Sequence, residues 1–292
     1  MQSSQKTKGI LLIISSAFFF AIMSAFVSMA GDLPFFEKVL FRNLVSMTVA
    51  AGVLIKKSIP LRVSRDCAVP LLLRSIFGTV SVFCNYYAID NLLLANANTL
   101  GKLNPFFGIA FSAVILKEKA SKAQLGCIGL ALLGSLFLLL PGLGTVGLPV
   151  LVGLLGAMAG GVVNVCLRVM KTRQTESAVI VFVFSACSTV VSLVPNLLHF
   201  EPMSLFQLFC LLMGGSACAV AQFSLTGAYR YAAAKDISIY DSTQIIFSAL
   251  LGFLLFGQIP TLTNFIAYGL ILLASYLLFC YHKRSSANRS LE

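Results

Sequence analysis

Ten mostly apolar stretches run along this chain, each long enough to cross a lipid bilayer as a helix. A spanning helix needs about 20 such residues, and a backbone in lipid must satisfy its own hydrogen bonds. The sequence predicts an all-α membrane protein with short connections and no separate soluble domain. We expect ten transmembrane helices at residues 8–30, 35–55, 69–89, 95–116, 123–141, 149–169, 178–197, 205–229, 236–256 and 262–281.

The composition agrees with a chain that lies mostly in lipid. Hydrophobic residues make up 58% of its 292 residues and charged residues only 11%, whereas a soluble domain has roughly 25% charged residues. The first 30 residues resemble a secretory signal peptide. Their apolar stretch is too long for one and no convincing cleavage site follows, so we expect residues 8–30 to stay as the first span.

Residue types that carry most enzyme chemistry are scarce. The chain has two histidines and no tryptophan, and its eight cysteines show no CxxC or CxxH spacing. Small buried packing residues are the usual role of such cysteines. No P-loop pattern is present, so ATP is not expected to drive the protein. The sequence predicts no metal site, no cofactor and no enzyme activity.

Lysines and arginines mark one side of the predicted bundle. Loops on the opposite side contain only Lys38. Since cytoplasmic loops carry the excess of positive charge, we expect both termini to be cytoplasmic. The net charge of +11 therefore reports topology, and nucleic-acid binding is the poorer explanation. The residues on the charged side are Lys6, Lys8, Lys56, Lys57, Arg62, Arg65, Lys117, Lys119, Lys122, Arg168, Lys171, Arg173, Arg230, Lys235, Lys283, Arg284 and Arg289.

The chain also repeats itself at a distance of 140 residues. The segment "FCNYYAIDNLLLANANTLGKLNPFFGIAFSAVILKEK" lies without gaps over "FSLTGAYRYAAAKDISIYDSTQIIFSALLGFLLFGQI". Each half has five spans, an odd number, so the halves would enter the membrane in opposite senses, as in many transporters. We expect two inverted five-helix repeats, residues 1–145 and 146–284, followed by a disordered tail at 285–292.

Polar side chains within the predicted spans are costly in lipid unless they face a cavity or a partner. Arg42 and Lys102 lie at similar depth and would form a cationic pair for a carboxylate or phosphate. Asp241 would meet an ammonium group or carry a proton. Gln222 lies on a polar stripe of its span, and Gln244 falls on Asn104 in the repeat. The expected substrate-binding residues are Arg42, Asn85, Tyr86, Asn98, Lys102, Gln222, Asp241 and Gln244.

Structural roles for the charged residues remain open at this point. Arg42 could pair with Glu37, and Lys102 could bond Glu37 or a carbonyl freed by Pro105, which marks either a hinge or a kink. Asp241 has two cations near it in sequence, Arg230 and Lys235. Arg74 lies near the cytoplasmic end of its span, where a long side chain can reach the interface.

Several segments resemble the drug/metabolite transporter superfamily, specifically its ten-span EamA-type members. These are "FFEKVLFRNL", "RSIFGTVSVFCNYYAI", "ANANTLGKLNPFFGIAFSAVILKEK" and "GCIGLALLGSLFLL". The third resembles the family's small-residue entry to the fourth span, then a Pro, then a Glu at the cytoplasmic end. In the second half, Ile245 and Gln258 replace that Pro and Glu. The resemblance implies a solute carrier but does not name its cargo.

These observations predict a secondary transporter of a small polar metabolite, an amino acid or an organic anion, that works by alternating access. The alternative is a lipid-handling or structural membrane protein. The expected partners are the substrate, membrane lipid and a coupling proton or counter-substrate, with no nucleic acid. We expect a multi-pass protein of the plasma or inner membrane, as a monomer or a homodimer.

Overall fold

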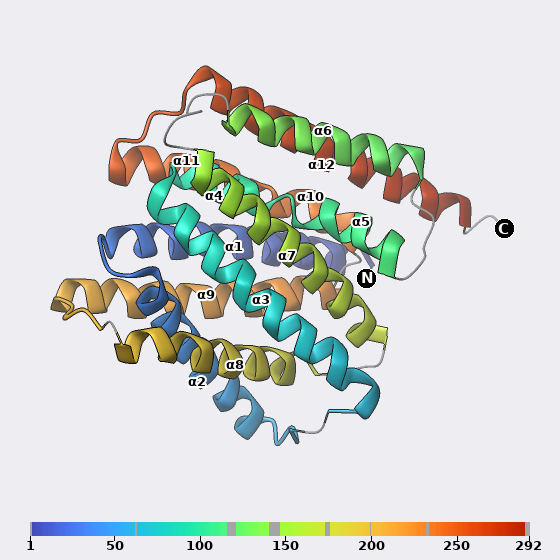
Figure 1. Ribbon diagram of the computed structural model, residues 1–292. Helices are drawn as coiled ribbons and strands as arrows, with labels where there is room; N and C mark the ends of the chain where they lie inside the picture. The colour runs from blue at the N-terminus through green and yellow to red at the C-terminus, as the bar shows by residue number, and fades with distance from the viewer. Residues whose placement is uncertain are drawn as a thin grey trace.

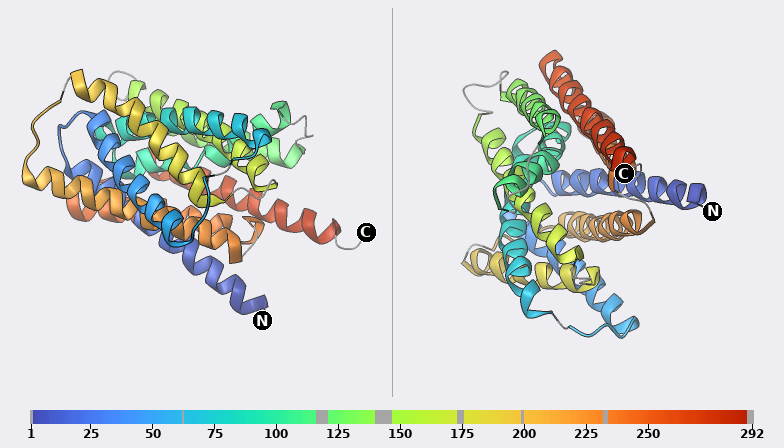
Figure 2. Two further views of the ribbon diagram at one scale, coloured as in Figure 1. Left: turned by 90° about the horizontal axis from the view of Figure 1, so that it is seen from below. Right: turned by 90° about the vertical axis from the view of Figure 1, so that its right-hand side faces the viewer.

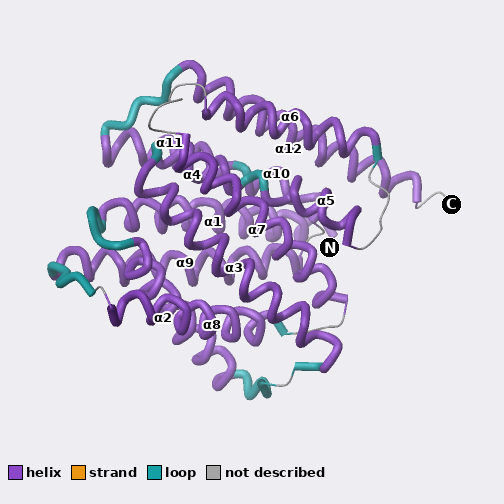
Figure 3. Tube along the Cα trace, viewed as in Figure 1, coloured by secondary structure: helices purple, strands orange, loops and turns teal. Residues whose placement is uncertain are grey.

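The chain folds into a bundle of helices in this computed structural model (Figure 1). The structure describes residues 2–61, 63–115, 121–139, 147–172, 176–198, 200–231 and 234–289. Within these ranges every regular element is a helix, and short loops join them (Figure 3). Arg62, Lys117, Lys119 and Arg173, which belong to the predicted cytoplasmic loops, lie outside the described residues.

Twelve helices occur in the described part of the chain. Their bounds are α1 Gln2–Met29, α2 Phe35–Lys56, α3 Arg65–Asn91, α4 Leu94–Gly101, α5 Asn104–Ile115, α6 Lys122–Leu139, α7 Gly147–Thr172, α8 Ser177–Leu198, α9 Leu205–Tyr231, α10 Ala234–Asp241, α11 Thr243–Phe256 and α12 Leu262–Arg289.

Eight segments of the described chain are long and apolar enough to cross a membrane. They correspond to eight of the predicted spans. Two predicted spans remain. The span at 123–141 forms the shorter apolar helix α6, and the span at 95–116 is divided between α4 and α5. The outer surface is rich in exposed apolar side chains such as Leu205, whereas Glu37 and Asn43 are fully buried. This distribution suits a protein whose surroundings are lipid.

Glycines end two of the helices. Gly31 follows α1 with φ of 68°, and Gly257 follows α11 with φ of 60°. A left-handed residue allows the last carbonyls of a helix to be satisfied locally, and glycine adopts it without a steric penalty. At α11, the Gln258 N–H donates to Gly252 O at 3.0 Å and the Gly257 N–H donates to Phe253 O at 3.1 Å.

Two predicted spans, 95–116 and 236–256, are not continuous helices. The first breaks at Lys102, where the Lys102 N–H donates to Thr99 O and the Leu103 N–H donates to Leu100 O. The second breaks at Ser242, whose N–H donates to Ile239 O. Pro105, which has no N–H, follows the first break. The second break has Ile245 at the corresponding position, so proline is not what the two breaks share.

Helices that are far apart in the sequence pack side by side. Helix α1 packs along α9, and α7 packs along α3. Helices α6 and α12 pack together at the upper edge of the bundle, and α2 and α8 lie together at the lower edge (Figure 1). The start of α1 and the end of α12 lie at the same end of the bundle (Figure 2), which we call the terminal end.

The C-terminal segment differs from its prediction. Helix α12 continues to Arg289, so the expected disordered tail is helical from residue 285 to that point. The segment "KRSSANR" contains neither Gly nor Pro, the two residues that most strongly end a helix. Residues 290–292 lie outside the described part of the chain.

Candidate functional site

A cavity of about 360 Å³ lies in the bundle where the two broken helices meet. Its wall is formed by helices from both halves of the chain and by the residues at the two breaks. Seven of the eight predicted binding residues line it, Arg42, Asn85, Tyr86, Asn98, Lys102, Asp241 and Gln244. The cavity therefore brings together predicted residues as far apart in the sequence as Arg42 and Gln244, which are separated by 202 positions.

Lys102 and Asp241 form an ion pair in the cavity wall. The Lys102 Nζ lies 2.6 Å from Asp241 Oδ2, and the two side chains are 10% and 26% exposed. Lys102 caps the C-terminal end of α4, where the partial negative charge of the helix favours a cation. Neither Glu37 nor a freed carbonyl is the partner of this ammonium group, so those two alternatives are wrong for Lys102.

Asn98 is held by a network that joins three helices. Its Oδ1 accepts from Ser24 Oγ of α1 at 3.0 Å and from Gln244 Nε2 of α11 at 2.9 Å. Its Nδ2 donates to Ser248 Oγ at 3.0 Å and to Leu94 O at 3.1 Å. An amide side chain has two acceptor sites and two donors. Asn98 uses all four within the protein, so this amide joins helices instead of presenting a free donor to the cavity.

Arg42 and Tyr86 retain unused polar capacity in the cavity wall. Arg42 is 7% exposed, and its Cζ lies 5.9 Å from the centre of the Tyr86 ring. The Arg42 Nε donates to Cys218 Sγ at 3.2 Å and its Nη1 donates to Asn43 Oδ1 at 3.4 Å. The buried Tyr86 hydroxyl has no hydrogen-bond partner among the residues that the structure describes.

The expected alternative pairing of Arg42 with Glu37 does not occur. The Glu37 Oε1 accepts instead from the Glu201 N–H at 2.7 Å. Among the described residues, no carboxylate forms an ion pair with Arg42. Arg42 therefore places a positive charge at the cavity that only neutral groups contact.

Gln222 does not join the other candidates. It lines a separate cavity of about 20 Å³ between α2, α8 and α9, together with Ser46 and Phe223. Gln222 lies on the predicted polar stripe of α9, but at this position the stripe faces α2 and α8. A single helix pattern does not say which neighbour a face will meet.

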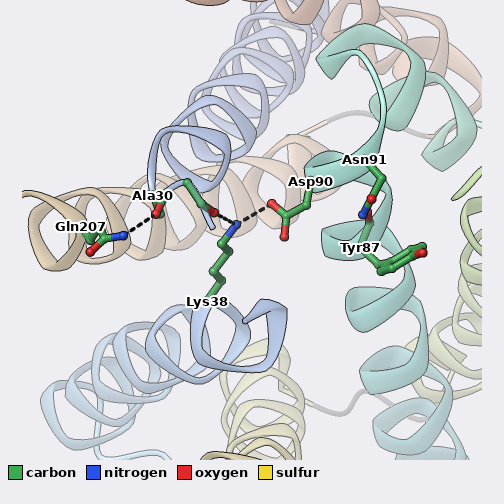
Figure 4. Close-up of polar contacts among 7 residues, drawn as sticks. Ala30, Lys38, Tyr87, Asp90, Asn91 and Gln207 are labelled. Atoms are coloured by element: carbon green, nitrogen blue, oxygen red, sulfur yellow. Dashed lines mark hydrogen bonds and ion pairs between the residues drawn. The ribbon is translucent and has the colours of Figure 1, made fainter. Parts of the chain in front are cut away.

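An ion pair closes one end of the bundle above the cavity. The Lys38 Nζ lies 2.6 Å from Asp90 Oδ1 and donates to Gly31 O at 2.7 Å. Figure 4 shows Lys38 of α2 reaching between the end of α1 and Asp90 near the end of α3. Lys38 is one turn from Arg42, and Asp90 is one turn from Tyr86, so this pair forms the next layer outward from the cavity.

The other end of the cavity extends toward the terminal end. Leu167 and Leu225 belong to its lining and lie in the C-terminal parts of α7 and α9. Both helices run toward the terminal end (Figure 1). The Lys38–Asp90 layer thus lies one helical turn beyond the cavity on one side, and the cavity reaches toward the chain termini on the other.

Several polar groups at the site were not among the sequence candidates. Ser81 lines the cavity and donates to Gly156 O at 2.8 Å. Asn104 also lines it, and its Oδ1 is buried without a partner. Gly160 lies against Asn104 so closely that an added Cβ would be 2.6 Å from the amide. The glycine-rich run of α7 could have indicated this close approach, but not which residue it accommodates.

Comparisons with known proteins agree with this architecture. A sequence profile of the EamA-like transporter family matches residues 7–140. The pseudopaline exporter CntI of Pseudomonas aeruginosa is 30% identical over 255 residues, which cover 86% of this chain and 89% of that protein. The chain belongs to the EamA-like transporter family.

Further relatives of this EamA-like transporter cover most of its length. An uncharacterized transporter of Helicobacter pylori is 25% identical over 284 residues, 92% of this chain and 94% of that protein. A solved crystal structure superposes with a TM-score of 0.65 and 18% identity, covering 94% of this chain and 98% of the other. This last similarity shows the fold alone.

Membership of this family establishes the location and the general class of the protein. It is a multi-pass integral protein of the inner or plasma membrane, and its relatives are transporters and not enzymes. The resemblance to the drug/metabolite transporter superfamily is confirmed. The alternative of a lipid-handling or structural protein predicts an apolar interior whose buried charges are paired. The polar side chains in the cavity lining, and the lack of an ion-pair partner for Arg42 among the described residues, do not fit it.

Proposed function

We propose that this EamA-like transporter is a secondary carrier that exports a small polar solute by alternating access, without ATP. The observation that carries the proposal is the polar cavity at the meeting point of two broken helices, with Lys102 and Asp241 paired across it. In transporters with repeats, discontinuous helices form solute sites near the middle of the membrane. The direction of transport is inferred from the relative that is named as an exporter.

The helix bounds support ten spans in two inverted repeats. Shifting α3, residues 65–91, by 140 gives 205–231, the bounds of α9, and α4 at 94–101 gives 234–241, the bounds of α10. The packing of α1 on α9 corresponds to that of α7 on α3 under the same shift. If α4 and α5 count as one broken span, α10 and α11 as a second broken span, and α6 as an unbroken span, each half contains five spans.

The proposed topology places both termini in the cytoplasm, from the distribution of Lys and Arg. The cavity, which reaches toward the terminal end, would then be accessible from the cytoplasm. The Lys38–Asp90 layer would close the external side. Export requires this layer to open after the cytoplasmic side has closed, and a proton or counter-substrate would drive the cycle.

Within the cavity, we assign substrate contacts to groups that have capacity left. Arg42 would bind an acidic group, with the Tyr86 hydroxyl and Asn85 as neutral partners. Lys102 and Asp241 would exchange their mutual contact for contacts with the substrate, since charged hydrogen bonds of similar strength can replace each other. Asn98 and Gln244 would hold the wall in place.

The test of transport needs no prior choice of substrate. Cells that express the wild-type protein, the Lys102→Met variant or neither are compared for small polar metabolites in the medium by mass spectrometry. We expect at least one metabolite to accumulate with the wild type only, and pseudopaline is included among the standards. Equal metabolite concentrations in the media of all three strains, with the protein present in the membranes of the two expressing strains, would contradict the proposal.

A separate labelling experiment tests the topology. Single cysteines at Ser64, before α3, and at Pro202, before α9, are placed in a background that lacks the native cysteines. Both positions are exposed. Pro202→Cys should react with a membrane-impermeant maleimide in intact cells, and Ser64→Cys only after the cells are opened. Labelling of both in intact cells would exclude the inverted arrangement.

A further inference from the structure

Arg74 of α3 is a buried cation that the fold leaves largely unused. It is 7% exposed, and its Nε and Nη1 atoms are buried without a hydrogen-bond partner. No carboxylate in the described part of the chain forms an ion pair with it. This burial corrects our expectation that the side chain reaches the interface. A buried charge without a partner is costly, so its retention calls for a reason.

The contact with Phe184 leaves the hydrogen-bonding edge of Arg74 available. The Arg74 Cζ lies 3.9 Å from the centre of the Phe184 ring, a cation–π contact. This ring covers one face of the guanidinium group. The N–H donors of a guanidinium point outward in its plane, where carboxylates and phosphates bind. An anion can therefore bind the edge while Phe184 stays in place.

Gly78 shows that the Arg74 guanidinium lies beside the next turn of α3. A Cβ added at Gly78 would lie 3.5 Å from Arg74 Nη1 and 2.9 Å from the Phe184 ring. Gly78 is one turn beyond Arg74 along α3, and the cavity residues Ser81 and Val82 are about one turn farther. The absence of a side chain at Gly78 leaves room for the guanidinium and the Phe184 ring, about one turn of α3 from the cavity residues.

The lining of the cavity approaches the same place from α7. Leu167 lines the cavity and packs against a cluster that contains Leu71 and Cys166. Leu71 lies one turn before Arg74 on α3. Arg74 therefore lies one turn of α3 beyond the lining residues, near the part of the cavity closest to the terminal end, whereas Arg42 belongs to the lining itself.

The charges of this region do not balance. Lys102 and Asp241 neutralise each other. Arg42 and Arg74 both lack an ion-pair partner among the described residues, and the helices that carry them, α2 and α3, pack against each other. Two positive charges therefore remain in and beside the cavity.

We propose that Arg42 and Arg74 select a substrate that carries two negative charges, a dicarboxylate or a phosphate monoester. This inference rests on the proposed transport function and specifies its substrate class. One acidic oxygen set binds Arg42 inside the cavity and another binds the edge of Arg74 at the cavity margin. The substrate supplies the anionic partner that both guanidinium groups lack.

The experiment measures ligand affinity on the purified full-length protein in detergent. A ligand that binds the native state raises the melting temperature, and the stabilisation grows with the logarithm of its concentration divided by its Kd. The probes are succinate as the dicarboxylate, glycerol 3-phosphate as the phosphate monoester and butyrate as a monoanion with the carbon number of succinate. We expect at least one dianion to bind about tenfold more tightly than butyrate, about 1.4 kcal/mol.

Three variants assign the effect to the arginines. Arg74→Gln should raise the Kd of the dianion about tenfold and leave that of butyrate unchanged, because butyrate uses Arg42 alone. Arg74→Lys, which keeps the charge but loses the planar fork, should have an intermediate Kd. Arg65→Gln removes an exposed positive charge from the start of the same helix, and its Kd values should equal those of the wild type.

The outcomes separate the competing explanations. A response to succinate alone identifies carboxylates, and a response to glycerol 3-phosphate alone identifies phosphate monoesters. Butyrate binding as tightly as both dianions would overturn the inference. An unchanged Kd of the dianion in Arg74→Gln would also overturn it, because Arg74 would then only pack against Phe184. If Arg74→Gln does not fold, the Kd of Arg74→Lys decides in the same way. Export into the medium without dianion binding would remove this inference and leave the transport function intact.

Discussion

The ammonium group of Lys102 lies 2.6 Å from the carboxylate of Asp241, 139 residues away in the sequence. Each residue is at a helix break, Lys102 after α4 and Asp241 at the end of α10. The pair thus links the two broken helices at the cavity. Movement of one break relative to the other must change this contact, so the pair can connect solute binding with a change of conformation.

Removal of one partner should affect stability and transport together. Asp241→Asn leaves Lys102 buried without its counter-charge, and we expect a loss of about 3 kcal/mol in stability. The double variant Lys102→Met/Asp241→Asn should recover most of it because no charge remains unpaired. The export rate of both variants should fall at least about tenfold, because charge-assisted contacts to the solute are lost. Melting temperatures and export rates check this, and normal export by the double variant would exclude a role for the pair in transport.

Asn98 should be required for the structure of the wall. Asn98→Ala removes four hydrogen bonds and leaves Ser24, Ser248 and Gln244 without this partner, so we expect a loss of about 2–4 kcal/mol. The matched control is Asn91→Ala, since the exposed Asn91 makes one local bond to Tyr87 O (Figure 4). The free energy of unfolding of this control should lie within about 0.5 kcal/mol of that of the wild type. Similar melting of both variants would show that the network contributes little.

The break between α4 and α5 should not depend on its proline. Pro105→Ala restores an N–H, yet the α10–α11 break exists with Ile245 at the matching position. We therefore expect Pro105→Ala to retain export within about threefold of the wild type, which corresponds to less than 1 kcal/mol. Export rate per folded molecule is the measurement. Loss of export with an unchanged melting temperature would mean that proline sets the conformation of the break.

The Lys38–Asp90 layer should limit access to the cavity from outside. A cysteine at Val82, which lines the cavity, serves as the reporter in a background without native cysteines. Lys38→Met or Asp90→Asn should increase its reaction with an impermeant maleimide about tenfold, if the pair favours the closed state by about 1.4 kcal/mol. Asp32→Asn, which removes an exposed carboxylate nearby, should not.

The charge swap Lys38→Asp/Asp90→Lys completes this test. It should return the labelling of the Val82→Cys reporter toward the starting level, because the ion pair can re-form in the opposite sense. Equal labelling in all of these variants would show that the layer does not control access.

Much of the candidate site could be anticipated from polar residues in apolar segments. Lys102 and Arg42 attract attention because lipid is a poor solvent for charge, and that reasoning needs no coordinates. The roles of Asn98 and Gln222 could not be anticipated in this way. Each lies on a polar helix face, but Asn98 meets three hydrogen-bonding partners and Gln222 faces a different cavity. A helix pattern reports the face and not its neighbour.

The sequence by itself determined that this protein lies in the membrane and where most of its spans are, since these depend on the length and spacing of apolar segments. Only the tertiary structure decided that two spans break, that Lys102 pairs with Asp241 and that Arg74 is buried without an ion-pair partner among the described residues. Those properties arise from contacts between residues far apart in the chain. Their energies depend on distance and burial in three dimensions, which no local pattern of residues records.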